Sequence, residues 1–217
     1  MATLNATNLK HASSGSNNIV LAADGSTTIS NLSGGVGKIL QVVQTRVVTT
    51  SSTANSSFSD TSLVRTITPA SASNKILCLI DMQYGGTNGS EVVFKLVRFD
   101  NNGTGTNIAY SSASTHMPGF HGVYISNSGA GIGYYGLLNA GVNTLDTAVN
   151  AAEHSYRVQW RAVQGTVYLN RTGAGTTAAN YSPTGCSTIT LMAVSYTHLR
   201  AHETGRNLVC RLLREKK

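Results

Sequence analysis

The stretch His154–Asn170, HSYRVQWRAVQGTVYLN, constrains the fold of this chain more than any other part of the sequence. Apolar and polar residues alternate through its first half, which places the only tryptophan, Trp160, on the apolar face of an extended strand. Gln164-Gly165 then offers a tight reversal, because glycine readily adopts positive φ. The run Thr166–Asn170 again favours β structure. The stretch therefore predicts a β-hairpin that carries Trp160 into the core.

Other β-favouring runs follow one another along the chain, separated by segments rich in Gly, Ser, Thr and Asn. No segment shows a sustained helical period of apolar residues. Many short strands at this spacing predict an all-β protein, a jelly-roll-like antiparallel β-sandwich over residues 38–193. The further predicted strands are Lys38–Thr49, Ser57–Asp60, Leu63–Thr68, Lys75–Tyr84, Glu91–Phe99, Ile108–Ser111, Phe120–Ile125, Gly133–Leu138, Leu145–Val149 and Ser187–Met192.

Residues 1–37 have too few apolar side chains to close a core of their own. Asn18–Leu21 and Thr27–Ser30 nevertheless have the composition of short strands, separated by a turn at Asp24-Gly25. We expect a stalk or attachment segment whose strands are completed by neighbouring copies of the chain. The alternative is a disordered arm.

The composition changes abruptly at residues 194–217, where Arg, His and Leu replace the Gly/Ser/Thr/Asn texture. This segment, beginning VSYTHLRAHET, resembles a translated sequencing adapter, which implies that it is not native; the alternative is a natural basic helix. It holds six basic and two acidic residues, so it supplies four of the seven net positive charges. The rest of the chain is only weakly basic, so we expect no nucleic-acid partner. We also expect its removal to leave the fold intact.

The acidic residues of the body form no close motif for glycan cleavage, so we expect no catalytic residue, although distant pairs could meet in space. Asp100–Gly105 mimics the start of a calcium loop, but Ser111 occupies the position where an acidic ligand is required. A plain hairpin loop is the better interpretation, and we expect no metal and no cofactor. Cys78 and Cys186 lie in strand-like runs; free buried thiols are favoured over a disulfide.

Two short segments carry the residue types of a contact surface. The first surrounds Pro118-Gly119, where two histidines could be solvent-facing or could meet on a three-fold axis to hold a metal. The second is a pair of adjacent tyrosines. The candidate receptor-contact residues are His116, Met117, Phe120, His121, Tyr134 and Tyr135.

Several longer strings resemble tail-fibre-like proteins of marine bacteriophages. They are TLNATNLKHASSGSNNIVLAADGSTT, GVGKILQVVQT, RTITPASASNKIL, SYRVQWRAVQGTVYLNR and STITLM. The resemblance implies a trimeric appendage with a slender N-terminal part and a globular head, whose jelly roll is similar to those of complement C1q and tumour necrosis factor.

The expected function is therefore that of a virion appendage that binds a host cell-surface receptor without catalysis. The alternatives are a structural decoration or baseplate component and a polysaccharide depolymerase. The expected partners are the chain itself as a homotrimer, a host surface glycan or outer-membrane component, and other virion proteins. The start of the chain lacks a signal-peptide pattern and no apolar run reaches about 18 residues, so we expect location in the virion without membrane insertion.

Overall fold

The computed structural model describes residues 8–9, 19–21, 23, 27–29, 38–111, 118–126, 133–175 and 182–195. These residues form strands and turns and contain no helix, and hence none that could cross a membrane. The chain divides into two compact units. One comprises residues 38–196, and the other comprises residues 1–37 and 197–217.

The smaller unit contains a three-stranded antiparallel sheet in the order β1-β2-β3. Its strands are β1 (Asn8–Leu9), β2 (Ile19–Leu21) and β3 (Thr27–Ile29). Ile19 is the register partner of both Leu9 and Ile29. The two short strands predicted in this region are confirmed, and β1 adds a third.

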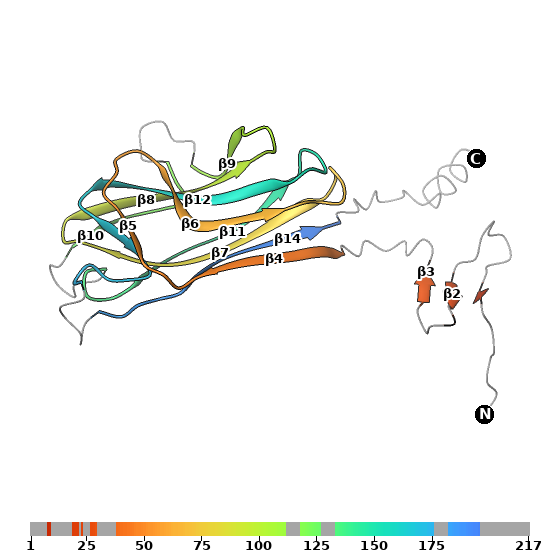
Figure 1. Ribbon diagram of the computed structural model, residues 1–217, viewed down its shortest axis with the longest axis horizontal. Helices are drawn as coiled ribbons and strands as arrows, with labels where there is room; N and C mark the ends of the chain where they lie inside the picture. The colour runs from red at the N-terminus through yellow and green to blue at the C-terminus, as the bar shows by residue number, and fades with distance from the viewer. Residues whose placement is uncertain are drawn as a thin grey trace, which may run out of the picture. The chain divides into compact units, whose positions relative to one another are not determined.

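The larger unit contains two antiparallel sheets (Figure 1). The first sheet has the order β4-β14-β7-β13-β5, with β11 on the free edge of β7, and the second has the order β10-β8-β12-β6, with β9 also on β8. The bounds are β4 (Ile39–Val47), β5 (Ser51–Thr53), β6 (Ser59–Ile67), β7 (Lys75–Gly86), β8 (Ser90–Phe99), β9 (Gly105–Ala109), β10 (His121–Ile125), β11 (Leu138–Thr147), β12 (His154–Gln164), β13 (Val167–Leu169) and β14 (Ser187–Val194).

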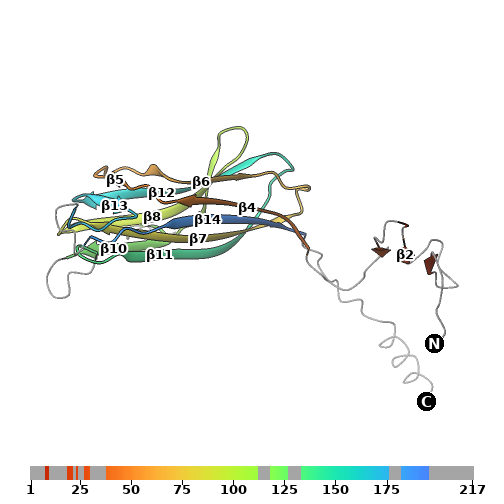
Figure 2. The same ribbon diagram turned by 60° about the horizontal axis from the view of Figure 1, so that its bottom comes forward.

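The strand order is that of a jelly roll. In three cases two consecutive strands together take the place of one jelly-roll strand. They are β4 with β5, β9 with β10, which both pair with β8, and β13 with β14, which both pair with β7. Numbered along the chain, the eight positions then run 1-8-3-6 in the first sheet and 2-7-4-5 in the second. This is the arrangement of two wrapped Greek keys, and Figure 2 shows its two layers from a second direction. The predicted all-β sandwich is confirmed.

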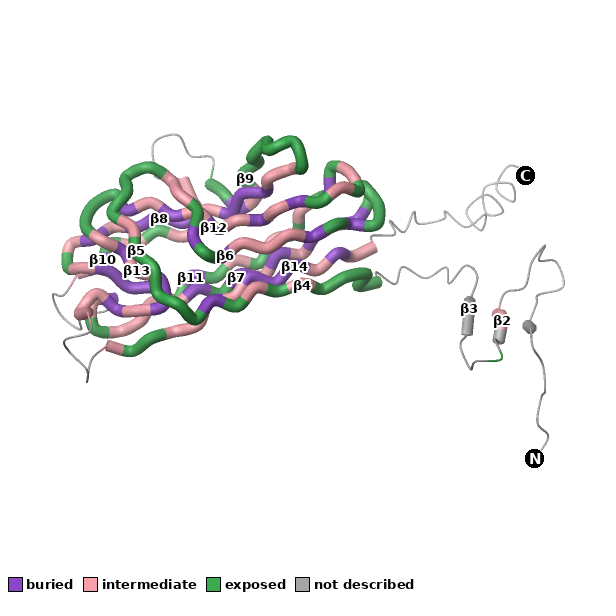
Figure 3. The backbone as a smooth tube through the Cα atoms, viewed as in Figure 1, coloured by how far each residue is buried: buried purple, intermediate pink, exposed green. Residues whose placement is uncertain are grey.

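The core lies between the two sheets, and buried residues alternate with more exposed ones along the strands (Figure 3). On β12, Tyr156, Val158 and Ala162 are buried, and Trp160 is only 3% exposed. The predicted inward face of this strand is confirmed. Full burial of each large apolar side chain contributes about 1.5–3 kcal/mol. The opposite layer contributes Ile76, Cys78, Ile80, Met82 and Tyr84 from β7, and Ile189, Leu191 and Ala193 from β14.

The predicted hairpin at Gln164-Gly165 is wrong in one respect. The turn exists, and Gly165 has a φ of 69°, but β12 and β13 belong to different sheets and do not pair. Val167 and Leu169 on β13 are buried in the core as part of the first sheet. The chain therefore passes from the second sheet to the first at this turn. A Cβ on Gly165 would lie 2.7 Å from Ser90, so only glycine fits this crossing.

Strand bounds differ from the prediction in further places, among them β9, which spans Gly105–Ala109 where the sequence predicts Ile108–Ser111. Residues 133–136 form a turn, and β11 begins only at Leu138 and continues to Thr147. Its inward-facing residues include the small Ala140 and the polar Asp146. The sequence of this strand therefore lacks the regular alternation of apolar and polar residues. The runs predicted at 57–60 and 63–68 join into the single strand β6, whose pairing with β12 shifts register between Arg157 and Gln159.

The chain enters and leaves the sandwich at neighbouring points. The Ser195 amide donates to the Lys38 carbonyl at 2.8 Å, and the Lys38 amide donates to the Ser195 Oγ at 2.9 Å. Val194 is the last residue of β14. The predicted boundary at residue 194 therefore cuts through the end of this strand, and residues 196–217 lie outside the described residues.

Trp160→Ala is expected to lower the free energy of unfolding by about 3–5 kcal/mol, because it removes a large side chain from a close-packed core. Chemical denaturation of both proteins measures this loss. Tyr110→Ala is the matched control, because Tyr110 is 41% exposed and its truncation should change stability little. Native tryptophan fluorescence typical of a water-exposed indole would contradict the assignment.

A chain ending after Ser195 is expected to melt at the temperature of the full chain, because it keeps β14 and both hydrogen bonds to Lys38. A chain ending after Ala193 loses Val194, the last residue of β14, together with both hydrogen bonds, and should melt lower. Differential scanning calorimetry of the three proteins makes the comparison. Equal destabilisation by both truncations would show that residues 196–217 contribute to the fold.

Candidate binding surface at the distal end

The distal end of the sandwich is the end opposite Lys38 and Ser195. Lys75 starts β7 beside Val194, and β7 runs from there to Gly86. Twelve extended residues at about 3.3 Å each place the two ends roughly 35–40 Å apart. The distal end comprises residues 84–90, 124–126, 133–136 and 165–175, and it is the left-hand end of the sandwich in Figure 1.

The turns of the distal end hold one another through backbone hydrogen bonds that join segments far apart in the sequence. Glycines allow this close approach: a Cβ on Gly85 would lie 2.7 Å from the carbonyl oxygens of Arg171 and Gly133. The surface is therefore built on fixed turns. The hydrogen bonds run from the amides of Gly86, Thr87, Gly89 and Ala174 to the carbonyls of Gly133 (3.1 Å), Thr166 (2.8 Å), Ile125 (2.8 Å) and Tyr134 (2.9 Å), respectively.

Tyr134 and Tyr135 occupy one of these turns, directly after Gly133, whose φ is 83°. Their rings meet edge to face with centroids 4.7 Å apart. Tyr135 is 46% exposed and Tyr134 is half-buried. The structure thus places this predicted pair at the distal surface, where a turn holds the two rings in contact.

Two further aromatic residues of this end were missed by the sequence analysis. Tyr124 on β10 is 58% exposed because its neighbour Ile125 points inward. Tyr168 on β13 lies beneath the Arg171 guanidinium, whose carbon is 3.8 Å from the ring centroid. The alternation around Ile125 was a usable signal for Tyr124. No local pattern pointed to the stacking of Arg171 on Tyr168.

Phe120 and His121 do not join this surface. His121 pairs in register with Phe94 and faces the sandwich interior, where its Nε2 lies 2.5 Å from the Tyr84 hydroxyl. Phe94 packs edge to face on Tyr84 at 5.0 Å and stacks with Phe120 at 6.3 Å. These four rings form an internal cluster. His116 and Met117 lie outside the described residues.

Burial sets the protonation of this cluster. It lowers the pKa of His121 below its ordinary value of 6.5 and raises the pKa of Tyr84. Both groups are therefore neutral near pH 7, and the Tyr84 hydroxyl can donate to an unprotonated Nε2 of His121. Protonation of His121 would remove that acceptor.

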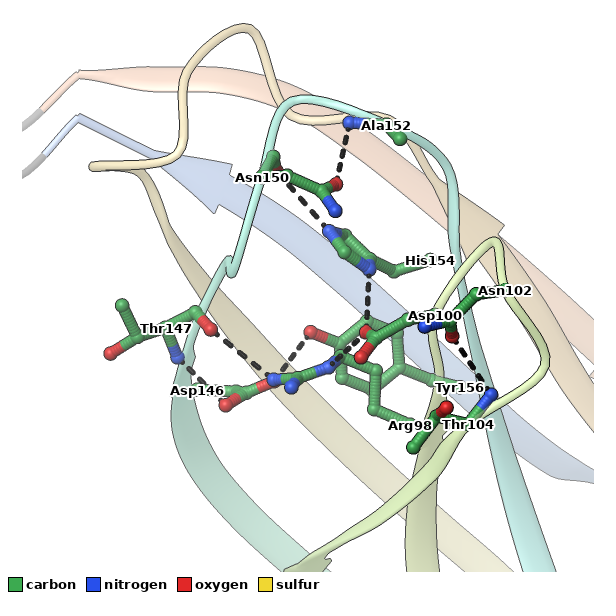
Figure 4. Close-up of polar contacts among 10 residues, drawn as sticks. All are labelled: Arg98, Asp100, Asn102, Thr104, Asp146, Thr147, Asn150, Ala152, His154 and Tyr156. Atoms are coloured by element: carbon green, nitrogen blue, oxygen red, sulfur yellow. Dashed lines mark hydrogen bonds and ion pairs between the residues drawn. The ribbon is translucent and has the colours of Figure 1, made fainter.

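The proximal end, where the chain enters and leaves, holds a buried polar network that the sequence did not reveal (Figure 4). The Arg98 guanidinium, on the second sheet, lies between two carboxylates. Its Nε donates to Asp100 at 2.8 Å and its Nη1 donates at 2.5 Å to Asp146, on the first sheet. The Tyr156 hydroxyl donates to the same Asp146 oxygen at 2.7 Å. Burial, reinforced by the Asp146 charge, raises the pKa of Tyr156, so this hydroxyl keeps its proton.

His154 completes the network from a fully buried position. Its Nδ1 lies 3.0 Å from Asp100 and its Nε2 lies 3.2 Å from the Asn150 carbonyl. Asp100 thus faces Arg98 and His154, and its backbone begins the turn that joins β8 to β9. The predicted hairpin loop at 100–105 is confirmed. No cluster of three or more metal-ligating side chains occurs among the described residues.

Among the described residues both cysteines are free. Cys78 is fully buried, and burial raises the pKa of its thiol. Cys186 is half-buried and accepts a hydrogen bond from the Arg46 Nε at 3.1 Å. The predicted free thiols are confirmed, but only Cys78 is buried as predicted.

Comparisons with known proteins show no family for this chain. No family model matches the chain, and no curated protein matches it. A solved structure of infectious bursal disease virus, Gx strain, matches with 9% sequence identity and a TM-score of 0.26. The match covers 82% of this chain and 48% of that one, so this chain spans about half the length of the viral chain.

The stability of the protein is expected to fall as the pH drops below about 6.5, in part because of His121. The unfolded chain binds a proton on this histidine more readily than the folded chain, so acid favours unfolding. His121→Phe should flatten the decline between pH 7.5 and pH 5, measured as the free energy of unfolding. Tyr84→Phe removes the same hydrogen bond but keeps the histidine, so the decline should persist; equal slopes in all three proteins would contradict this account.

Proposed function

We propose that this chain is the head of a phage virion appendage that binds a host cell-surface glycan or outer-membrane component without catalysis. The observation that carries the proposal is the placement of two exposed tyrosines, Tyr135 on a fixed turn and Tyr124 on β10, at the end farthest from the chain's entry and exit. A head tethered through Lys38 presents that end to its target. Tyrosine suits such a role because its ring gives contact area and its hydroxyl gives hydrogen bonds at little entropic cost.

The two carboxylates that flank Arg98 support a non-catalytic role. Asp100 and Asp146 both face Arg98, and Asp146 also accepts from Tyr156 and from the Thr147 amide at 2.7 Å. A glycan-cleaving pair needs one group able to donate a proton and another free to attack or activate water. Carboxylates held by a guanidinium are poorly suited to either task.

Self-association as a homotrimer is the second part of the proposal, and an apolar row on the outer face of the first sheet supports it. Val42, Met192, Leu77 and Leu145 are register partners across β4, β14, β7 and β11. Val42 is 53% exposed and Leu145 is 52% exposed. A contiguous apolar row on an exposed sheet face is typical of a surface covered by another copy. The same row would serve a structural decoration protein, which is the second candidate function.

Leu145→Lys is expected to convert a trimer into a monomer, because it places a charge within the covered row. Sedimentation equilibrium at micromolar concentration measures the mass. Val163→Lys is the matched control, since Val163 is 38% exposed at the end of β12 on the other sheet and should leave the trimer intact. A wild-type protein that sediments as a monomer would refute the trimer.

Tyr135→Ala and Tyr124→Ala are each expected to weaken binding to susceptible bacteria by at least about tenfold, because exposed aromatic anchors dominate such contacts. Flow cytometry of the fluorescent protein on a panel of marine bacterial strains measures binding. Tyr110→Ala removes an exposed tyrosine outside the distal end and is the control. Wild-type protein that binds no strain would favour the decoration role. Equal loss of binding in all three variants would show that the distal end is not the binding surface.

A further inference from the structure

The outer face of the second sheet gathers two cations around one aromatic ring. Lys95 on β8 and Arg161 on β12 are diagonal neighbours, since Gln159 pairs with Lys95 and Arg161 pairs with Val93. Phe58 precedes β6 beside them. The Lys95 Nζ lies 4.3 Å from the Phe58 ring centroid, and the Arg161 guanidinium carbon lies 5.3 Å from it. The ring thus holds both charges at one place on the sheet.

Neither cation has an acidic partner among the described residues. The nearby Asp60 is committed elsewhere: it accepts from Arg157 at 2.8 Å and from Gln159 at 2.7 Å. Glu91 shares the outer face but forms none of the ion pairs found in the described part of the chain. Those pairs are Arg98–Asp100, Arg98–Asp146, His154–Asp100 and Arg157–Asp60.

The arrangement is unfavourable in the isolated chain. Two like charges held as neighbours on one sheet face repel each other. All three side chains are half-buried, and the Arg161 Nε is buried without a hydrogen-bond partner among the described residues. Burial also lowers the pKa of Lys95, a cost to the charged form that an adjacent anion would offset. An anion bound between the two would therefore relieve the repulsion and give the Arg161 guanidinium an acceptor.

We propose that Lys95 and Arg161, positioned by Phe58, form a binding site for an anionic sugar group, the carboxylate or sulfate of an acidic surface glycan. Arginine binds the oxygens of such groups through paired hydrogen bonds, and lysine adds a point charge. Tyr124 lies on the same sheet face, opposite Glu91, so a sugar chain extending from the cation pair would meet an exposed aromatic ring. This inference rests on the proposed function and adds the chemical class of the receptor.

The test uses the full chain and three labelled hexasaccharides of similar length: a sulfated heparin fragment, a carboxylated oligogalacturonate and neutral maltohexaose. Binding is measured by fluorescence anisotropy at low salt and at physiological salt. The double variant Lys95→Gln/Arg161→Gln is compared with Lys38→Gln/Arg46→Gln, which removes the same charge from β4 and the residue before it. Thermal melts confirm that both variants remain folded.

The inference predicts that wild type binds one or both acidic probes and not the neutral one, that the first variant binds at least about tenfold more weakly, and that the second changes affinity less than about twofold. Preference between sulfate and carboxylate then identifies the group. Equal loss in both variants, equal binding of maltohexaose, or no binding of either acidic probe would overturn the site.

The cell-binding assay separates this inference from the function on which it rests. If wild type and the Lys95→Gln/Arg161→Gln variant bind bacteria equally well, the anion site fails while host recognition stands. If wild type binds no strain, host recognition fails, and the anisotropy assay still decides whether the cation pair binds anions.

Discussion

The buried pairing of Arg98 with two carboxylates is the constraint on which the rest of the sandwich depends. A guanidinium taken out of water is tolerated only where its partners are also fixed, and removal of one partner from such a pair typically costs about 3–5 kcal/mol. Because Asp146 belongs to the first sheet, Arg98 and Tyr156 belong to the second, and Asp100 lies in the turn after β8, the network aligns the two layers at one end. It does so where the chain enters at Lys38 and leaves at Ser195.

With the layers aligned at the proximal end, the distal end is built mainly from glycine-rich turns. Gly85, Gly86, Gly133 and Gly165 let four segments approach so closely that side chains would clash. The turns in return hold Tyr134 and Tyr135 in a fixed edge-to-face geometry. A binding surface of this kind loses little conformational entropy when it meets a target. The proposed function rests on this difference between the two ends of the sandwich.

The sequence predicts the parts of this structure that depend on local alternation. The inward face of β12 and the burial of Trp160 follow from single-residue alternation, and a turn at Gly165 follows from its composition. The sheet that β13 joins does not follow, because a tight turn fits both a hairpin and a crossing between layers. The middle of β11 escapes prediction because its inward face includes the small Ala140 and the polar Asp146. The charged network is equally hidden, since Arg98 and Asp146 lie 48 positions apart and meet only through the topology.

The most direct test of host recognition by the distal end is hydrogen–deuterium exchange of the chain bound to outer-membrane vesicles from a strain that it recognises. Slower amide exchange is predicted in residues 84–90, 124–126, 133–136 and 165–175 upon binding, with no change along β4 and β11 beyond that caused by self-association. Protection confined to the proximal residues around Lys38 and Asn150, with the distal turns exchanging as in the free protein, would contradict the account.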